Sequence, residues 1–423
     1  MTTADVVIDS IAAGGDGVGR TNGVVVFVPR AARGDRVRVD LDVRKRFARG
    51  TIRELIEPSP DRVDPLCYHY RVDRCGGCQL QHVSYGAQLD AKRLIIRDSL
   101  ARIGRRQVEP PDIEPSKEPW RYRRKLTLAM RRSRAGDWTI GLHPLDDPVN
   151  VFQLADCPIT DERVVTVWRE VMEARRFFPL ADELRASVRL TDDGAAVVME
   201  GGNAWPERLA FFEAVPSATA LWWRPAHRAR SLVAKRGTST AGASFEQVNA
   251  AMGARLHDFV LERAAKYEAA TVLDAYAGSG ATALRLARAG ARVTAVEADR
   301  DASASCAAEL PDGSRAIAAR VEDVIGEVLP VDLVLVNPPR TGLHETVTAE
   351  LQGTPHAPRA IIYVSCDPPT LARDLARLPR YRIASLKAFD MFPQTAHVET
   401  VCELVPDEEG EGEGEGEEEA AAS

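Results

Sequence analysis

The sequence lacks any hydrophobic run long enough to cross a membrane. A membrane helix needs about 18 or more consecutive apolar residues, and no stretch of this 423-residue chain approaches that length. Residues 1–5 also lack the basic region and apolar core of a secretory signal peptide. We therefore expect a cytoplasmic enzyme that has no membrane partner.

Cysteine is scarce as well. The chain has seven, an odd number, and without a secretory signal such a count argues against a disulfide framework. Three of them, Cys67, Cys75 and Cys78, lie within twelve residues, and the other four are widely spaced. This uneven spacing predicts a metal site together with cysteines that have a different role.

Basic residues are absent from 407–419, which includes nine acidic side chains. We expect 407–423 to be a disordered polyanion. The nine negative charges of this tail exceed the net charge of −7 of the whole chain. The rest of the chain therefore has a slight excess of positive charge. That excess is concentrated in 90–134, with fourteen Lys or Arg against six Asp or Glu. Such a segment is either a solvated surface or a binding site for RNA phosphates.

Residues 1–57 alternate short apolar runs with glycine-rich turns, which predicts a small β-barrel. Its basic residues are Arg20, Arg30, Arg33, Arg44, Lys45, Arg46 and Arg49. A barrel with basic loops is a common nucleic-acid-binding module, although barrels also serve as spacers. Two stretches, Gly14-Gly-Asp-Gly-Val-Gly-Arg20 and Val26-Phe-Val-Pro29, resemble the TRAM domain. That resemblance implies an RNA-binding barrel.

The clustered cysteines form the motif Cys67-x7-Cys75-x2-Cys78. The two glycines inside the last pair allow a tight turn, by which two thiolates can reach one centre. His82 is a candidate fourth ligand for zinc, and Cys157 offers a fourth thiolate, which suits zinc or a 4Fe–4S cluster. A redox-active Cys-x-x-Cys pair is the alternative.

The region up to residue 240 has a mixed α/β pattern. Residues 85–103 predict an amphipathic helix. Residues 120–130 interleave aromatic and basic side chains, which is typical of a strand with one face in a core and the other toward RNA. Further strands are expected near Gly141, Val188 and Val197. We interpret the adjacent Trp222 and Trp223 as core residues rather than as platforms on which bases stack.

Strands and helices alternate from residue 241 to residue 406, as in a doubly wound α/β domain. A strand at 271–275 leads into a turn with Gly278 and Gly280, and the next strand ends at Glu297, 19 residues beyond Gly278. This order is typical of a nucleoside-cofactor site, where the glycines admit the ligand and the acid binds ribose. A third glycine and a P-loop lysine are absent, which favours S-adenosylmethionine over NAD or ATP.

Two further strands are expected to end at the same edge of the sheet. The first leads into Asn337-Pro-Pro-Arg340, and the second into Ser365-Cys366-Asp-Pro. A cysteine there stands where open α/β sheets hold their ligands, although a lone cysteine is often only a small buried hydrophobe. Near the C-terminus, His397 and Glu399 have acid/base potential.

These features together resemble the RNA 5-methyluridine methyltransferases, an S-adenosylmethionine-dependent family that modifies uridine C5 in ribosomal and transfer RNA. The resemblance covers nearly the whole chain apart from the tail and much of 160–235. It rests on Cys67, Cys75, Cys78 and Cys157, Phe245-Glu-Gln247-Val-Asn249, Tyr276 with Gly278 and Gly280, Pro338-Pro-Arg340, Ser365-Cys366-Asp-Pro, and Phe392-Pro-x-Thr-x-His397-Val-Glu399.

The resemblance implies a role for each set of residues. The cysteine set would bind a 4Fe–4S cluster, Cys366 would be the nucleophile and Glu399 the general base. The cofactor site would be formed by Gln247, Tyr276, Glu297 and Asn337, beside Gly278 and Gly280. Asn337 departs from the family, which usually has Asp there, so one charge of the cofactor site is lost.

The predicted architecture is α/β in three parts. Residues 1–57 form a small TRAM/OB-like β-barrel, and 58–240 form a central α+β region with the iron–sulfur cysteines and the basic segment. Residues 241–406 form a Rossmann-like class I methyltransferase domain, followed by the acidic tail. We expect a monomer that acts on RNA, with ribosomal RNA favoured over transfer RNA because of the barrel.

The proposed chemistry explains the residue types independently. Uracil C5 is a poor nucleophile, but a thiolate that adds to C6 turns the ring into an enolate able to attack a methyl donor. A carboxylate then removes the C5 proton, and the base must be unstacked to reach the site.

Two other functions remain open. Asn337-Pro-Pro also resembles amine-directed methyltransferases, but those usually continue with an aromatic residue, where this chain has Arg340. A non-catalytic iron–sulfur RNA-binding protein would not need the Cys366 and Glu399 pair.

Overall fold

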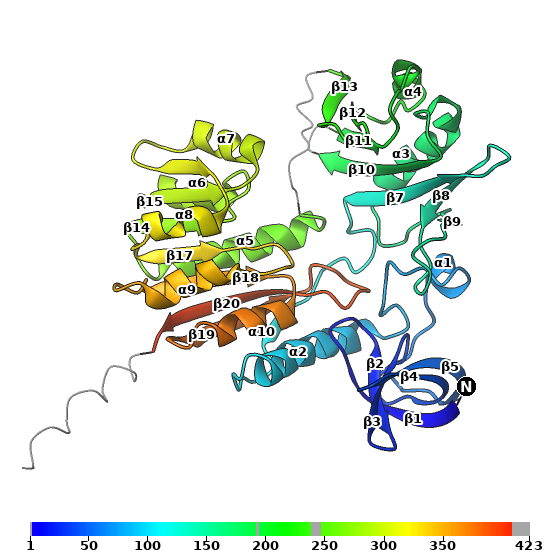
Figure 1. The fold of residues 1–423 in the computed structure, drawn as a ribbon, viewed down its shortest axis with the longest axis horizontal. Coiled ribbons are helices and arrows are strands. Elements are labelled where there is room, and N and C mark those ends of the chain that lie inside the picture. Colours follow the sequence, from blue (N-terminus) through cyan, green and yellow to red (C-terminus); the bar gives the residue numbers. More distant parts are fainter. Residues whose placement is uncertain (1, 192–193, 238–246, 408–423) are drawn as a thin grey trace, which may run out of the picture. The chain divides into compact units, whose positions relative to one another are not determined.

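The computed structural model describes residues 2–191, 194–237 and 247–407. Its packing divides the chain into two units (Figure 1). The first comprises Met1–Lys92, Ser116–Gly253 and Met391–Ala396, and the second Arg93–Pro115, Ala254–Asp390 and His397–Ser423. The tail expected to be disordered, from residue 408 onward, and the family mark at Phe245 lie outside the described residues. Of the helices that are described, none is both long and apolar enough to cross a membrane.

The N-terminal segment forms the predicted barrel, whose five strands close in the order β1-β2-β3-β5-β4. The strands are β1 (Thr2–Ile11), β2 (Gly17–Thr21), β3 (Val24–Val28), β4 (Arg36–Val43) and β5 (Ala48–Glu57). Alternate residues fill the interior, among them Val6, Ile8, Val26, Val28, Val37 and Val39. Gly19 has to be glycine, because a Cβ there would lie 2.2 Å from the Val7 carbonyl oxygen.

A seven-stranded sheet forms the rest of the first unit, in the order β13-β12-β11-β10-β7-β8-β9. The strands are β7 (Lys125–Arg132), β8 (Trp138–Leu142), β9 (Phe152–Gln153), β10 (Glu183–Thr191), β11 (Gly194–Glu200), β12 (Ala220–Arg224) and β13 (Ser231–Lys235). The other elements are α1 (Tyr68–Arg71), α3 (Glu162–Glu173), the 3-10 helix η1 (Ala174–Phe177) and α4 (Arg208–Glu213). One face of the sheet packs with α3 and α4 into an apolar core that includes Trp168, Phe211 and Met199.

The strands predicted near Gly141, Val188 and Val197 are confirmed as β8, β10 and β11. The strand predicted from Trp120 begins only at Lys125. The residues before it instead form loop contacts with the cysteine region, such as the hydrogen bond from the Arg121 N–H to the Pro158 carbonyl (2.9 Å).

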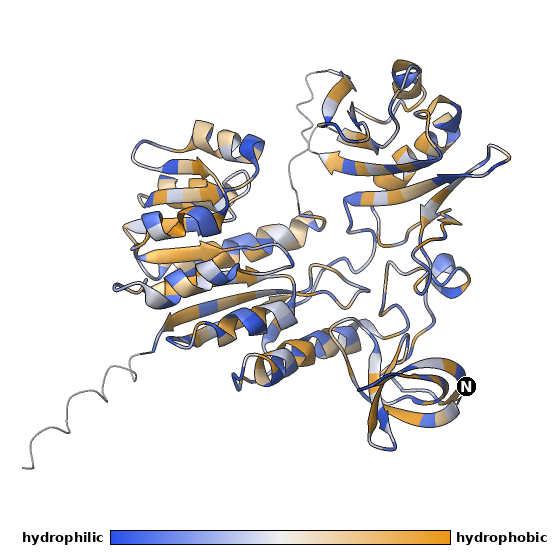
Figure 2. Cartoon of the chain, viewed as in Figure 1, coloured by the Kyte–Doolittle hydropathy of each residue, from blue (hydrophilic) through white to orange (hydrophobic). Residues whose placement is uncertain are grey.

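The second unit contains an eight-stranded sheet in the order β16-β15-β14-β17-β18-β20-β19-β6. Strands β14, β15, β16, β17 and β18 are parallel, and β20 is antiparallel to both β18 and β19. The strands are β6 (Asp112–Glu114), β14 (Thr271–Ala275), β15 (Arg292–Glu297), β16 (Arg315–Ala318), β17 (Leu333–Val336), β18 (Ala360–Ser365), β19 (Tyr381–Phe389) and β20 (Glu399–Pro406). Strand β17, buried along its whole length, is orange in Figure 2, as expected for the centre of a parallel sheet.

Its helices are α6 (Ala281–Arg288), α7 (Arg300–Glu309), α8 (Val321–Val328), α9 (Glu345–Gly353) and α10 (Pro368–Ala376). Two others, α2 (Tyr85–Arg102) and α5 (Ala250–Ala265), continue across the boundary between the units. The helix predicted over 85–103 is thus confirmed, and Ile96 and Leu100 of α2 pack into the core of the second unit. One strand was not expected in this sheet: β6 comes from the segment predicted to be central and pairs with β19.

Candidate active site

Four parallel strands bring the predicted site residues to one edge of the sheet. Tyr276, Glu297, Asn337 and Cys366 stand at or just after the carboxyl ends of β14, β15, β17 and β18. The strand ends are level, because Ala275 pairs with Val296 and Val336, and Val336 with Tyr363. Open α/β sheets bind their ligands at this edge.

The glycine turn after β14 provides an open backbone surface. Gly278 and Gly280 have φ angles of +57° and +84°, which favour glycine. A Cβ on Gly278 would have no atom within 4 Å, whereas one on Gly280 would lie 2.3 Å from Cys306 Sγ. Gly278 therefore leaves room for a ligand, and Gly280 allows close packing against α7.

Glu297 is tied to this turn. Its Oε2 accepts a hydrogen bond from the Gly278 N–H (2.9 Å), and its Oε1 accepts one from the Asp299 N–H (2.8 Å). Each carboxylate oxygen keeps a lone pair for a ribose hydroxyl. The turn and the acid therefore fit the nucleoside part of S-adenosylmethionine, as the sequence predicts.

Asp274, near the end of β14, was not identified from the sequence. Burial raises its pKa to about 7, and its Oδ2 has no hydrogen-bond partner among the described residues. The one signal in the sequence is an acidic residue inside a buried apolar strand, since burying an unpaired carboxylate is unfavourable. An unsatisfied acceptor beside the glycine turn is a further feature that a bound cofactor could satisfy.

Cys366 and Glu399 are the predicted nucleophile and general base, and the charge of Glu399 acts on Cys366. Burial raises the pKa of the Cys366 thiol, and Glu399 raises it further, while Arg340 opposes both. Burial also raises the pKa of Glu399 to about 7, again opposed by Arg340. Glu399 is buried, so it suits a general base that must be close to half ionised at neutral pH.

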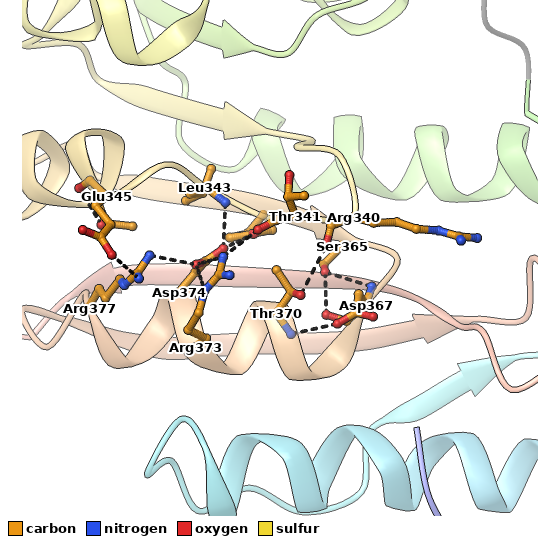
Figure 3. A network of polar contacts seen from close by, with 12 residues as sticks. Arg340, Thr341, Leu343, Glu345, Ser365, Asp367, Thr370, Arg373, Asp374 and Arg377 are labelled. Carbon is orange, nitrogen blue, oxygen red and sulfur yellow. Dashed lines mark hydrogen bonds and ion pairs between the residues drawn. The ribbon is translucent and has the colours of Figure 1, made fainter. Parts of the chain in front are cut away.

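Arg340 is held by a polar network centred on Asp374 of α10, which the sequence did not reveal (Figure 3). Asp374 Oδ2 accepts hydrogen bonds from the Leu343 N–H (2.8 Å) and the Tyr363 hydroxyl (2.7 Å). The Thr370 hydroxyl donates to the Arg340 carbonyl (3.2 Å). In Figure 3 the Arg340 side chain extends away from these contacts, so the network fixes its backbone and leaves the guanidinium free to reach the site.

The loop after Cys366 is also fixed from within. Asp367 is the N-cap of α10, where its Oδ1 accepts from the Thr370 N–H (2.9 Å). The Asp367 N–H donates to the Ser365 hydroxyl oxygen (3.2 Å), and Pro368 occupies the first turn, where proline is tolerated. The helix begins at Pro368.

Gln247 and His397 complete the candidate residues. Gln247 belongs to the first unit, where its side chain covers Gly253. His397 is partly buried two residues before Glu399. Gln247 therefore stays a predicted cofactor residue, and His397 a predicted acid/base group.

The cysteine set lies in the first unit, where Cys67, Cys78 and the partly buried Cys157 pack with Tyr70 and Tyr122, and Cys75 is buried. Burial raises the pKa of Cys78, and Cys157, Cys75 and Cys67 raise it further. Burial likewise raises the pKa of Cys75 to about 11, with contributions from Cys157 and Cys67. The four thiols are therefore close enough to interact electrostatically. Among the described residues, however, no group of three or more His, Cys, Asp or Glu is arranged to hold a metal ion.

His82 is a poorer candidate than Cys157 for the fourth ligand. Its Nδ1 is 2.7 Å from the Tyr70 hydroxyl oxygen, and burial lowers its pKa to about 4, with a further lowering by Arg62 and Arg30. Cys157 interacts with the other three thiols. Cys157 is thus the better candidate for a fourth ligand, and four thiolates are the donor set that a 4Fe–4S cluster prefers.

Two segments of the chain match known families. Residues 2–52 match the TRAM domain, and residues 303–405 match the family tRNA (Uracil-5-)-methyltransferase. With the nucleoside-binding turn and the level strand ends, they define the class: this is an S-adenosylmethionine-dependent RNA methyltransferase.

Relatives match over almost their whole length. An uncharacterized RNA methyltransferase of Thermosynechococcus vestitus is 31% identical, over 95% of this chain and 98% of its own. One of Gloeobacter violaceus is also 31% identical, over 95% and 96%. The chain therefore belongs to the TRAM-containing RNA methyltransferases, and the match of residues 303–405 to the tRNA (Uracil-5-)-methyltransferase family supports the resemblance inferred from its motifs, with the iron–sulfur cluster still a prediction.

A solved structure shows the same fold. The tRNA (uracil-54, C5)-methyltransferase of Pyrococcus abyssi, in complex with S-adenosyl-L-homocysteine, superposes with a TM-score of 0.69. The match covers 95% of this chain and 99% of that one, at 24% sequence identity.

Proposed function

We propose that this enzyme methylates C5 of a uridine in RNA through a covalent adduct between Cys366 and C6 of the base. The observation that carries the proposal is the pairing of a partly buried thiol, that of Cys366, with the buried carboxyl group of Glu399 at the cofactor edge of the sheet. Burial raises the pKa of the Cys366 thiol and raises that of Glu399 to about 7, so neither group has to be fully charged at neutral pH when a neutral base binds.

The bond changes assign one role to each residue. Cys366, once its thiol has lost its proton to solvent, forms a bond from Sγ to C6, and the ring electrons move toward C5 and O4. After C5 has gained the methyl group, the Glu399 carboxylate accepts the C5 proton. The electrons of that C–H bond restore the C5–C6 double bond as the Sγ–C6 bond breaks, which returns Cys366 as a thiolate.

S-adenosylmethionine would supply the electrophilic methyl group. We propose that Glu297 binds the ribose of S-adenosylmethionine and that Gly278 and Gly280 allow the cofactor to approach the backbone closely. Tyr276, Asn337 and Gln247 would complete the site. Asn337 can donate and accept hydrogen bonds, but unlike the usual Asp it adds no negative charge.

We further propose that Cys67, Cys75, Cys78 and Cys157 hold a 4Fe–4S cluster, which would organise the RNA-binding region. Protein purified without oxygen should then be brown and contain about four irons per chain. One zinc and no colour would identify a zinc site instead. Removal of the metal should destabilise the first unit, since metal binding by a site formed on folding contributes to folding free energy.

We favour ribosomal RNA because of the TRAM barrel, although the enzyme of Pyrococcus abyssi is described as acting on tRNA. We propose that the enzyme works as a monomer.

Incubation with S-adenosylmethionine and unmethylated RNA tests the function directly. Purified ribosomal RNA and tRNA should be tried separately, followed by digestion and mass spectrometry of the nucleosides. The expected product is 5-methyluridine, made by the wild-type enzyme and not by Cys366→Ala. Methylated adenine would indicate an amine-directed enzyme, and no methylation of any substrate would indicate a binding protein.

A further inference from the structure

The seven-stranded sheet has two very different faces. Leu126, Leu128 and Met130 of β7 alternate into the apolar core, so Lys125, Thr127, Ala129 and Arg131 lie on the other face. Strand β10 repeats the pattern, with Arg185, Ser187 and Arg189 opposite the core residues Leu184, Ala186 and Val188. We call this second face the basic face.

Cations gather on the basic face at neighbouring positions. Lys125 is paired directly with Arg189, and Arg185 with Ala129, in the register of β7 and β10. Arg123 precedes Lys125 by two residues and donates from Nε to the Lys125 carbonyl oxygen (3.2 Å). Folding therefore places four cationic side chains, from Arg123, Lys125, Arg185 and Arg189, on one side of two adjacent strands.

Two acidic residues of this face form ion pairs with other arginines, although Glu200 is also paired with Arg185 in the register of β10 and β11. Glu183 is 3.4 Å from Arg131, and Glu200 is 3.0 Å from Arg224. Burial, and then the charges of Arg189, Arg123 and Arg185, lower the pKa of Lys125 to about 8, against the opposing effect of Glu200. Like charges held together in this way are unfavourable in the free protein and favourable when a polyanion is bound.

An aromatic side chain lies on the same face. Trp222 is paired with Val198 across β11 and β12 and packs against Ala196 and Ala220. It is only partly buried, and the Arg230 guanidinium carbon lies 5.4 Å from its ring centroid. Trp222 therefore packs against a small apolar cluster on the basic face and not against the main core of the sheet.

The neighbouring Trp223 lies on the opposite face of the sheet. Trp223 packs against the main core, where its ring lies 5.9 Å from that of Trp205. Its Nε1–H donates to the Gly201 carbonyl (3.0 Å). Adjacent residues of a strand point to opposite faces, which leaves Trp222 with the cations.

We propose that the basic face binds a single-stranded segment of the substrate RNA, with its phosphates against Lys125, Arg185 and Arg189 and a base stacked on Trp222. The proposal rests on RNA being the substrate, as the proposed function has it. Cations that follow a backbone beside an aromatic platform are the usual means of binding single strands without reading sequence.

Binding of a fluorescein-labelled oligouridylate to the full chain tests the cationic part. Arg185→Ala, and Arg185→Ala with Arg189→Ala, should weaken binding and reduce the slope of log K against log salt by about 0.7 for each phosphate that the protein no longer neutralises. Arg169→Ala is the matched control, because Arg169 is exposed on α3, which covers the opposite face. Equal losses of affinity in the control, or unchanged slopes in both variants, would overturn the proposal.

Trp222 provides a separate test that does not depend on charge. Trp222→Leu should weaken oligouridylate binding roughly tenfold, and Trp222→Phe should restore most of the affinity, because a phenyl ring can still stack. Quenching of tryptophan fluorescence by the oligonucleotide should decrease in both variants. Equal affinity of Trp222→Leu and wild type would contradict the proposal.

Lys125→Met separates binding from folding. A lysine whose pKa falls from about 10.4 in the unfolded chain to about 8 in the fold opposes folding increasingly as pH falls through that interval. Lys125→Met should therefore raise the melting temperature at pH 7 while it weakens RNA binding. A variant that lost affinity only because it unfolded would show a lower melting temperature, which would contradict the proposal.

Two controls keep the outcomes distinct. Oligoglutamate should not displace the oligouridylate at equal charge, and if it does so with the same dependence on Trp222, the face binds an acidic protein segment instead. The nucleoside assay reports the reaction separately. A basic face that binds RNA in a protein that makes no 5-methyluridine would refute the proposed function alone, and methylation with unchanged binding by every variant would refute this proposal alone.

Discussion

The basic face of the first unit differs in its charges from the edge of the second unit's sheet at which Cys366 and Glu399 lie. We call that edge the strand edge. The basic face keeps four cations together, and one of them, Lys125, has a lowered pKa because of its burial and the charges of the others. At the strand edge, the burial of Glu399 and the partial burial of Cys366 raise the pKa of both groups, which brings that of Glu399 to about 7. The first arrangement suits a permanent polyanion, whereas the second suits groups that must gain and lose a proton during a reaction.

This difference predicts that the basic face serves RNA binding and that the strand edge serves the chemical step. Changes at the basic face should alter affinity and salt dependence while the chemical step stays intact. Changes at the strand edge should alter the chemical step while RNA affinity stays intact. Variants of the second unit are the sharper tests, because one residue can abolish catalysis while many share the binding of a polyanion.

Cys366→Ala should have the largest effect. Loss of the nucleophile should reduce turnover on the order of 10⁴-fold or more, with RNA affinity unchanged. Single-turnover methyl transfer and filter binding should be measured on the same preparation. Cys402→Ala is the control, since Cys402 is buried in β20 and has no assigned role. An active Cys366→Ala would leave the covalent mechanism without its nucleophile.

Asp374→Asn should have the next largest effect. The loop from Arg340 to Leu343 would lose its charged anchor, and a displacement of about 1 Å at a reacting group can reduce kcat roughly 10²-fold. Because Arg340 lowers the pKa of Glu399, the pH at which the rate is half-maximal should also rise. A merely destabilised protein would not shift its pH profile.

Glu345→Gln is the matched control for that variant. Glu345 forms an ion pair with Arg377 at the exposed end of the same network (2.7 Å). Exposed ion pairs contribute about 0–1 kcal/mol, so this variant should keep both rate and pH profile.

Glu399→Gln should have a smaller effect on stability, with a sign opposite to that of most buried substitutions. The pKa of Glu399 is about 7 in the fold and about 4.3 in an unfolded chain. The folded state thus binds the extra proton between these values, and Glu399 makes the protein less stable as pH rises from about 4 to 7. Glu399→Gln should raise the melting temperature at pH 8 and change it little at pH 4. Equal shifts at both values would show that the carboxyl group does not titrate as proposed.

Much of the second unit could be predicted from the sequence because its signals are local. A buried strand followed by Gly278 and Gly280, and another followed by Cys366, place residues at one sheet edge whatever the rest of the chain does. The TRAM barrel is local in the same sense. Pairings between distant segments gave no such signal: β6 joins β19 more than 260 residues later in the chain, in the register of Asp112 with Lys387.

Asp374 and the basic face show two other limits. Asp374 is one acid in an ordinary amphipathic helix, and only folding brings the Leu343 N–H and the Tyr363 hydroxyl to it. The basic face did have a signal in the alternation of Arg185 and Arg189 with apolar residues. That period also assigns Trp222 and Trp223 to opposite faces, so they could not both belong to one core.

The reaction of Glu399→Gln with RNA tests the covalent mechanism most directly. Without a base for the C5 proton, Cys366 should still attack C6 and the methylated adduct should persist. Denaturing electrophoresis should show a protein–RNA band that forms only when S-adenosylmethionine is present and disappears in the double variant with Cys366→Ala. Normal turnover by Glu399→Gln, with no such band, would contradict the account, and the neighbouring His397 would then be the group to test as the base.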